Sequence, residues 1–489
     1  MLFNSLEFVV FFPIVAALYF AFPYRFRWML LLAASYYFYM CWEPRYLILI
    51  LVSTLIDYGA GFMMGRTQEK SRRVKYLLLS LAGNLGLLFF FKYFNFLNDS
   101  LRALFGYFGA EYSVPQSDFL LPVGISFYTF QTLSYTIEVY RGNKEPEKHL
   151  GIFALYVAFF PQLVAGPIER AQNLLPQFFK RYDFDYDRVA NGLKLVLWGM
   201  FKKVVIADRL AHIVDAVYGA PGQHEGAAIV LATVCFAYQI YCDFSGYSDI
   251  AIGCAEVMGF RLMKNFDRPY FARSVPEFWR RWHISLSTWF RDYVYISLGG
   301  NRCSAPRWLF NLFIVFLVSG LWHGANWTFV VWGALHGAFV VASQLSGRWR
   351  QGAAERMGLT AVPRLHRVLQ VLATFCLVCF AWIFFRADSM ADAVGLVTHL
   401  FQGWDHVLSF PGIGVIQVGT LRASREDLIL SLLWIAMLQA VHLAQSRGSI
   451  REMVARRPLW VRWAAYSALL WLMASVGVFE SKEFIYFVF

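Results

Sequence analysis

Residues 308–346 read WLFNLFIVFLVSGLWHGANWTFVVWGALHGAFVVASQLS, and this stretch decides the fold class. Two apolar runs, 308–322 and 326–346, have about the length that crosses a bilayer as a helix. We therefore expect a hairpin of two membrane helices, with His323 close to its turn. An ionisable side chain inside a bilayer is costly and is a functional candidate by default.

The rest of the chain is equally apolar. Of its 489 residues 58% are hydrophobic, and the mean hydropathy of +0.47 is too high for an ordinary soluble protein. We predict an all-α polytopic membrane protein with about 11–12 transmembrane helices. Two runs, 149–166 and 246–260, are short and interrupted by Pro or Gly, so we interpret them as re-entrant or interfacial pieces. The predicted spans are 6–22, 28–43, 46–65, 76–97, 119–140, 189–207, 226–245, 308–322, 326–346, 367–386, 427–445 and 460–478.

Basic residues orient these spans. The net charge is +12, and most of the Lys and Arg residues lie in every second loop, which is typical of cytoplasmic loops rather than of nucleic-acid binding. The alternation predicts that both termini lie outside the cytoplasm. The basic clusters are 25–27, 66–75, 141–188, 261–307, 347–367 and 447–462.

Several kinds of site are not supported by the sequence. The seven cysteines show no disulfide frame, and the C-x-x-C of Cys376 and Cys379 falls in an apolar helix, where packing is its expected role. No H-E-x-x-H, Cys/His quartet, G-x-S-x-G, P-loop or Rossmann glycine pattern occurs. The start of the chain lacks a basic n-region and a cleavage site, so 6–22 is interpreted as a retained span.

The neighbours of His323 favour a functional role. Gly320 and Gly324 would let a substrate or a backbone approach closely, and Asn326 follows three residues later, within reach of the same helix face. Trp322 precedes the histidine directly. The alternative is a histidine that only packs helices together and bonds to a backbone carbonyl.

A second histidine lies in a basic stretch, FWRRWHISLSTWFRDY at 278–293. Arg280 and Arg281 would lower the pKa of His283 and hold the imidazole neutral, ready to accept a proton. The alternative is an interfacial amphipathic helix whose tryptophans Trp279, Trp282 and Trp289 lie at the lipid headgroups.

A third candidate is QIYCDFSGYSD at 239–249. Gln239, Asp243 and Tyr247 are spaced by four and would share one helix face, followed by Asp249 after a break at Gly246. Carboxylates within a membrane run need partners. We leave two roles open for them: structural ion pairing, or orientation of a catalytic imidazole.

These motifs together resemble the membrane-bound O-acyltransferase family, specifically its bacterial branch for alginate O-acetylation. The resemblance covers nearly the whole chain, with several matches in the same order. The matching stretches are Phe160–Arg170, Gln239–Asp249, Phe278–Gly300 with its Trp-Arg-Arg-Trp-His core, Trp322-His323-Gly324, and Glu483–Phe487.

The resemblance implies a many-helix fold around a central funnel or tunnel, as one membrane domain over 1–489 with a catalytic core near 119–346. It implies that His323 is the catalytic histidine and that His283 is the second family position. The implied donor is cytoplasmic acetyl-CoA, with no permanently bound cofactor and no metal. The implied partners are a periplasmic SGNH-type acetyltransferase and polysaccharide export machinery.

The chemistry of acyl transfer fits these residues. A neutral imidazole at His323 would take the proton of the acceptor hydroxyl, and Asn326 could donate to the developing oxyanion. Arg280, Arg281 and Lys264 could meet the phosphates of coenzyme A.

Other functions remain open. Within the family, the acceptor could be peptidoglycan or another cell-envelope polymer, or the reaction could be D-alanylation of teichoic acid. In a different class, the chain could be a transporter with His323 as a proton relay, although no internal repeat typical of transporters occurs. A purely structural scaffold for secretion is a third class, but it would not need a buried histidine.

Overall fold

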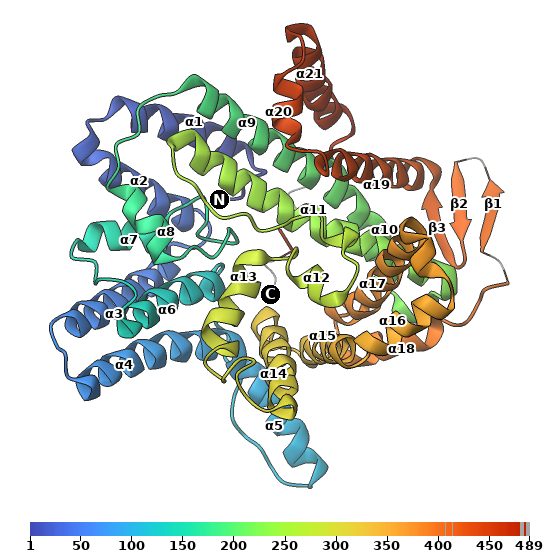
Figure 1. Ribbon diagram of the computed structural model, residues 1–489, viewed down its shortest axis with the longest axis horizontal. Coiled ribbons are helices and arrows are strands. Elements are labelled where there is room, and N and C mark those ends of the chain that lie inside the picture. Colours follow the sequence, from blue (N-terminus) through green and yellow to red (C-terminus); the bar gives the residue numbers. More distant parts are fainter. Residues whose placement is uncertain (406, 413, 480–483, 486–489) are drawn as a thin grey trace. The chain divides into compact units, whose positions relative to one another are not determined.

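The protein is described by a computed structural model of residues 1–405, 407–412, 414–479 and 484–485. Within these residues the chain divides into two compact units, and helices make up most of each (Figure 1). Unit 1 contains residues 1–196 and 248–264, and unit 2 contains residues 197–247 and the described part of 265–485. The predicted core 119–346 therefore contributes residues to both units.

Among the described residues of unit 1, all regular elements are helices. Ser5 caps the first helix by accepting a hydrogen bond from the backbone N–H of Phe8 at 3.3 Å. Its elements are α1 (Leu6–Ala21), α2 (Tyr24–Met40), η1 (Pro44–Tyr46), α3 (Leu47–Gly65), α4 (Lys70–Leu88), η2 (Phe89–Tyr93), α5 (Phe94–Tyr107), α6 (Ile125–Arg141), α7 (Leu150–Ala158), α8 (Ala171–Phe178) and most of α9 (Tyr186–Phe201).

Unit 2 combines long helices with short ones and a small sheet. The long helix α11 (Gly226–Met258) begins in unit 2 and ends in unit 1. The other elements are η3 (Lys202–Ala207), α10 (Asp208–Tyr218), η4 (Pro221–Gln223), η5 (Pro269–Phe271), α12 (Val275–Trp279), α13 (Ile284–Phe290), η6 (Arg291–Tyr295), α14 (Ala305–His323), α15 (Trp327–Leu345), α16 (Gly347–Arg356), η7 (Leu359–Ala361), α17 (Pro363–Arg386), α18 (Met390–His399), β1 (Leu408–Gly412), β2 (Val415–Val418), β3 (Leu421–Ser424), α19 (Arg425–Gln445), α20 (Ile450–Ala455) and α21 (Leu459–Val476).

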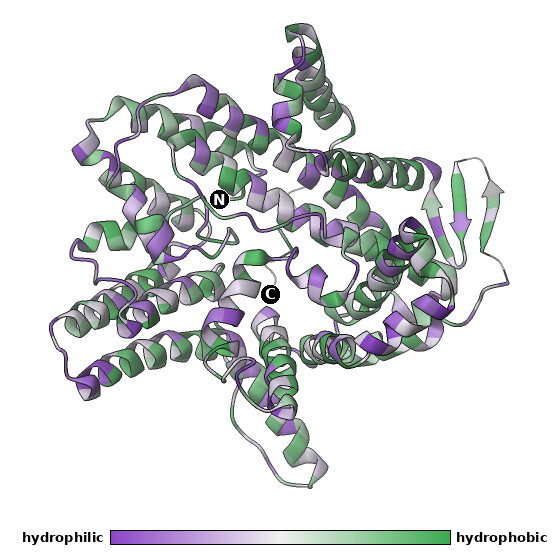
Figure 2. Cartoon of the chain, viewed as in Figure 1, coloured by the Kyte–Doolittle hydropathy of each residue, from purple (hydrophilic) through white to green (hydrophobic). Residues whose placement is uncertain are grey.

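The structure confirms a polytopic all-α membrane protein. Many of these helices carry hydrophobic residues along their length, for example α14 and α19 in Figure 2. Among the described residues, eight helices are long and apolar enough to cross a bilayer. They are Pro44–Gly65, Lys70–Tyr107, Gly226–Met258, Ala305–His323, Trp327–Leu345, Pro363–Arg386, Arg425–Gln445 and Leu459–Val476.

Four further predicted spans are helical but shorter than these. The helices α1 and α9 have 16 residues each, and α2 and α6 have 17. Helix α6 is rich in Ser, Thr and Gln, and most of its side chains are buried. Its polar groups bond within the protein; Gln131, for example, donates to the carbonyl of Tyr156 at 2.5 Å. Burial against protein rather than lipid explains why its sequence is less apolar than that of a lipid-facing helix.

The interrupted segment 149–166 combines a short helix with irregular backbone. After α7 the chain leaves helical geometry, yet residues 159–168 are buried, with Phe159 and Phe160 at 0% exposure. Irregular backbone at this depth is tolerated because protein covers it. The other interrupted segment is a correction: 246–260 is not a separate re-entrant piece, because α11 continues through Gly246 to Met258.

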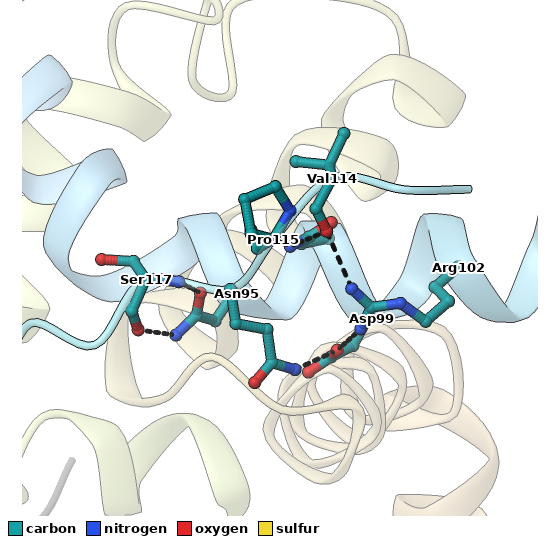
Figure 3. A network of polar contacts seen from close by, with 8 residues as sticks. Asn95, Asp99, Arg102, Val114, Pro115 and Ser117 are labelled. Carbon is teal, nitrogen blue, oxygen red and sulfur yellow. Dashed lines mark hydrogen bonds and ion pairs between the residues drawn. The ribbon is translucent and has the colours of Figure 1, made fainter.

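Polar contacts fold the segment after α5 back along that helix in unit 1 (Figure 3). Asn95 donates to the carbonyl of Ser117 and accepts from its backbone N–H, both at 2.8 Å. Arg102 donates to the carbonyl of Val114 at 2.9 Å and pairs with Asp99 at 2.9 Å. These contacts explain how a loop with an apolar surface keeps a defined path.

The segment between α17 and α19 also contains regular structure. It contains helix α18 and an antiparallel sheet in the order β1-β2-β3, in which Val415 pairs with Ser424 and Val418 with Leu421. Ser424 then caps α19 by accepting from the backbone N–H of Asp427 at 3.1 Å.

Candidate active site

His323 is the last residue of α14, as the predicted hairpin requires. The hairpin itself is confirmed, since α14 and α15 lie side by side, joined by residues 324–326 (Figure 1). His323 is 2% exposed, and its ring packs against Trp332 and Phe385, with centroid distances of 4.9 Å and 5.5 Å.

The glycines around His323 serve backbone packing. A Cβ atom on Gly320 would lie 2.3 Å from the carbonyl oxygen of Phe329 and 3.0 Å from the Cα of Gly333. A Cβ atom on Gly324 would lie 2.1 Å from the Phe329 ring. The sequence left open whether a backbone or a substrate approaches these glycines. In the structure, the backbone of α15 and the Phe329 side chain lie against them.

His283 occupies a left-handed turn in unit 2. It is the residue before α13, with φ of 42°, and its side chain is 0% exposed. Asn265 holds this turn: its carbonyl accepts from the backbone N–H of Ile284 at 2.9 Å, and its side-chain oxygen accepts from the Ser285 hydroxyl at 2.9 Å. Left-handed geometry is unusual for a non-glycine residue and is maintained only where surrounding contacts impose it.

The two histidines meet inside unit 2. Their ring centroids are 6.3 Å apart, with the ring planes at 57°. Phe244 of α11 presents its edge to His283 at 4.6 Å, and Trp322 contacts both imidazoles, at 6.0 Å and 5.0 Å. Residues 40 positions apart thus form one buried imidazole pair with aromatic walls.

Burial, rather than neighbouring arginine, sets the protonation of His283. Removal from water lowers the pKa of His283 well below its usual value. The predicted cause was wrong, because Arg280 is exposed and Arg281 is bound to Glu277 at 2.7 Å. The imidazole is therefore neutral at physiological pH and able to accept a proton.

The interfacial alternative for 278–293 is also wrong. Trp282 is 0% exposed, Trp289 is 5% exposed and Trp279 is 7% exposed, so these rings lie in the protein core and not at lipid headgroups. Trp279 donates its indole N–H to Nδ1 of His336 at 3.2 Å, a contact that gives this histidine a structural role.

Gln239, Asp243 and Tyr247 do lie on one continuous helix, so the predicted shared face is confirmed. Asp243, however, forms an ion pair with Lys203 of η3 at 2.7 Å, and Lys203 also pairs with Asp208 at 2.9 Å. All three side chains are at most 4% exposed. Of the two roles left open, structural pairing is therefore the one that the contacts support.

Two residues distant in sequence contact the ion-paired triad of Lys203, Asp208 and Asp243. The backbone N–H of Ile485 donates to Oδ2 of Asp243 at 2.8 Å. Phe484 is 1% exposed, stands perpendicular to the Tyr247 ring at 4.9 Å, and lies under the Lys203 ammonium at 4.5 Å. In the sequence, 483–487 stood out only through the family resemblance. In the structure, the described residues 484 and 485 of that stretch contact the triad.

Asn326 has a different position from the one predicted. Because α14 ends at His323, Asn326 does not share its helix; it caps α15 by accepting from the Thr328 backbone N–H at 3.1 Å. Its amide nitrogen donates to the carbonyl of Asp388 at 3.0 Å. Both the oxygen and the nitrogen of the Asn326 side chain are therefore hydrogen-bonded within the protein. The predicted role of this amide as a donor to the developing oxyanion loses its geometric basis. Lys264, one of the predicted donor-binding residues, is exposed and belongs to unit 1.

Sequence reasoning assigned no role to Glu169, which lies in the motif 160–170. Its carboxylate, 0% exposed, accepts hydrogen bonds from the backbone N–H of Met263 and from the side chain of Asn173. Burial raises the pKa of Glu169 to about 7. These contacts within unit 1 tie the irregular segment to the stretch after α11, a structural role for this motif. The sequence offered one signal for this role: a carboxylate placed within an apolar motif needs hydrogen-bonding partners when it is buried.

The described residues hold no group of three His, Cys, Asp or Glu side chains that could bind a metal ion. What the site does offer is two buried imidazoles within a bundle of membrane-spanning helices. Residues 148–386, which include both histidines, match the model of the membrane-bound O-acyltransferase family. The chain belongs to this family and is a multi-pass membrane O-acyltransferase.

Individual relatives extend this match over most of the chain. It is 42% identical over 426 residues to the probable alginate O-acetylase AlgI of Pseudomonas aeruginosa, covering 86% of this chain and 79% of that protein. It is 43% identical to the corresponding protein of Azotobacter vinelandii, covering 84% and 80%. It is 35% identical to the peptidoglycan O-acetyltransferase of Helicobacter pylori, covering 74% and 72%.

Proposed function

We propose that this enzyme moves acetyl groups from cytoplasmic acetyl-CoA across the bacterial inner membrane for O-acetylation of an exported polysaccharide such as alginate. One observation carries the proposal: two buried imidazoles lie 6.3 Å apart, by ring centroids, in a chain 42% identical to a probable alginate O-acetylase. No additional metal or cofactor is part of the proposal.

His323 acts as the general base in this mechanism. Its imidazole takes the proton of the acceptor hydroxyl while the hydroxyl oxygen attacks the thioester carbonyl. The tetrahedral intermediate then expels the coenzyme A thiolate, and the imidazolium returns the proton to the sulfur, so a C–O bond replaces a C–S bond. His283, neutral and next to His323, orients or hydrogen-bonds a reacting group. Both imidazoles are at most 2% exposed, so the reacting groups reach them only if neighbouring side chains such as Trp322 move.

The alternating basic loops support cytoplasmic entry of the donor, with both termini outside the cytoplasm. Arg280 and Arg281 are proposed contacts for coenzyme A phosphates, with Arg281 leaving Glu277 to reach them. Lys264 is proposed separately as a contact for the same anionic donor. The acceptor hydroxyl of this step belongs to a periplasmic SGNH-type acetyltransferase. That partner, acting with the export machinery, then passes the acetyl group to a hydroxyl of the polymer, which breaks the first ester and regenerates the partner's own hydroxyl.

Sided vesicles test this proposal. Inside-out inner-membrane vesicles containing the enzyme, the partner transferase and alginate receive acetyl-labelled acetyl-CoA from outside. We expect label on the luminal polymer and none when right-side-out vesicles are used. If added peptidoglycan fragments carried the label and alginate did not, the acceptor would be peptidoglycan, the polymer in the name of the Helicobacter relative. Label on no acceptor under any condition would contradict the acyl-transfer route.

His283→Gln is expected to lower the turnover number at least tenfold, with a smaller change in KM, because the residue lies next to the base rather than at the surface. Initial rates in the vesicle assay measure both constants. His336→Gln is the matched control, since it replaces another 0% exposed histidine of unit 2 that bonds to Trp279. Equal losses in the two variants would assign His283 a packing role.

Exposed native cysteines report the topology. Cys303 lies in the basic segment 261–307, and Cys41 lies beside the loop 43–45, which falls outside the basic clusters and is therefore expected on the opposite side of the membrane. We expect a membrane-impermeant maleimide to label Cys41 but not Cys303 in intact spheroplasts, and both after lysis. Single cysteines at Lys75 and Arg364 in a cysteine-free background should behave like Cys303. Labelling of these positions from outside would overturn the orientation.

A further inference from the structure

A basic pocket lies in unit 1, apart from the residues proposed for catalysis. It has a volume of about 200 Å³ and forms where α2 and α7 begin and α8 ends. Arg25, Arg27, Lys180 and His149 supply its basic groups, and the described residues that line it include no carboxylate. Side chains such as Leu31 and Leu155 form an apolar floor. The pocket therefore combines positive charge with a hydrocarbon-compatible wall.

Arg27 supplies a buried charge that pairs with no carboxylate among the residues that the structure describes. It is 7% exposed, and its guanidinium donates to three backbone carbonyls, those of Phe20, Phe22 and Tyr182, while lying over the Tyr19 ring. Carbonyls satisfy the hydrogen bonds of a guanidinium but leave its net positive charge in place. A buried, fixed cation of this kind favours an anion in the adjacent cavity.

Two exposed cations flank this buried one. Arg25 and Lys180 are exposed at the pocket, so each can turn toward an incoming anion. His149 caps α7 through Nδ1, which accepts from the Ile152 backbone N–H at 3.1 Å, and its other ring nitrogen is available as a donor. Several cationic or N–H donors around one cavity suit the oxygens of a phosphate group.

The surroundings place the pocket at a membrane surface. Phe22, Tyr24, Phe26 and Phe179 are exposed aromatic residues around it, as expected at the level of lipid headgroups. The basic clusters 25–27 and 141–188, which the charge pattern assigns to the cytoplasmic side, both contribute to it. A cavity of about 200 Å³ has room for a headgroup of several atoms.

We propose that this pocket binds the phosphate of an anionic phospholipid, such as phosphatidylglycerol, from the cytoplasmic leaflet. The phosphate lies among Arg25, Arg27 and Lys180, and the glycerol backbone and upper acyl chain follow the apolar floor. The proposal is independent of the acyl-transfer reaction, because it concerns residues outside the candidate active site and is tested by binding.

The test uses the purified full-length chain in detergent and native mass spectrometry with added lipid. Wild-type protein is expected to retain phosphatidylglycerol in preference to phosphatidylcholine. Arg25→Gln/Lys180→Gln is expected to weaken retention about 30-fold, from the usual contribution of basic residues to anionic-lipid binding. Lys70→Gln/Lys75→Gln is the matched control, since it removes two exposed charges from another predicted cytoplasmic segment of unit 1. The control is expected to match the wild type.

A photoactivatable phosphatidylglycerol should also crosslink to peptides containing 24–31 or 149–155. Displacement of that lipid by micromolar coenzyme A, but not by equal inorganic phosphate, would overturn the lipid assignment in favour of the coenzyme. Equal weakening in both double variants would reduce the effect to general surface charge and overturn the pocket. Because both replaced residues are exposed, folding of the variants, monitored by size-exclusion chromatography, is expected to be unaffected.

Discussion

His323→Gln is expected to abolish measurable acetyl transfer while the protein remains folded in the membrane. A positioned base contributes about 10²–10⁴-fold to such a reaction, and glutamine cannot accept a proton at working pH. Glutamine fills much of the same space between Trp332 and Phe385, so the α14–α15 packing should survive. The measurement is label transfer in the sided vesicles, normalised to enzyme content by immunoblot.

His336→Gln again provides the comparison, because it lies on α15 and is fully buried without contacting His283. It should retain most of the activity. Wild-type rates in His323→Gln would remove the residue from the mechanism. Loss of folded protein in both variants would instead show that buried histidines of this hairpin are needed for stability, and His323→Asn would then be measured in the same way.

Lys203→Met is expected to have the largest effect on stability. It would leave Asp208 and Asp243 facing each other at no more than 4% exposure without the cation that now lies 2.7–2.9 Å from each of them. Removing one partner of a buried ion pair costs about 3–5 kcal/mol. We expect a much lower unfolding temperature in detergent, followed by fluorescence-detected size exclusion after heating.

A second substitution separates charge from packing. Lys203→Met/Asp243→Asn removes one carboxylate and should recover part of the lost stability, whereas adding Asp243→Asn to the wild type should destabilise it. Lys75→Met, at an exposed position in unit 1, controls for loss of a lysine. If Lys203→Met unfolded at the wild-type temperature, the triad would not be a stabilising element.

Much of the helical framework could be predicted from hydropathy. All twelve predicted spans are helical, and the hairpin around His323 begins and ends within a few residues of its prediction. The predicted helix break at Gly246 was wrong, because this glycine allows helices to pack closely and does not end one. A Cβ atom at this position would lie 2.9 Å from the carbonyl oxygen of Gly199. A single sequence cannot distinguish these two uses of glycine.

Tertiary contacts account for the other differences. The segment around His283 has the composition of an interfacial helix, but aromatic neighbours such as Phe244 and Trp382 bury it, and these come from helices distant in sequence. The partner of Asp243 likewise could not be read from spacing, because Lys203 lies 40 residues earlier on η3. The two histidines were identified as candidates, whereas their proximity required the fold.

The attachment of Phe484 and Ile485 to α11 makes this short segment part of the buried ion-pair network, because the backbone N–H of Ile485 donates to Oδ2 of Asp243. A change of bulk at Phe484 would also be transmitted to the Tyr247 ring, which lies 4.9 Å away. An affinity handle inserted beside these two residues would therefore disturb a buried contact, and an exposed surface turn is the better place for one.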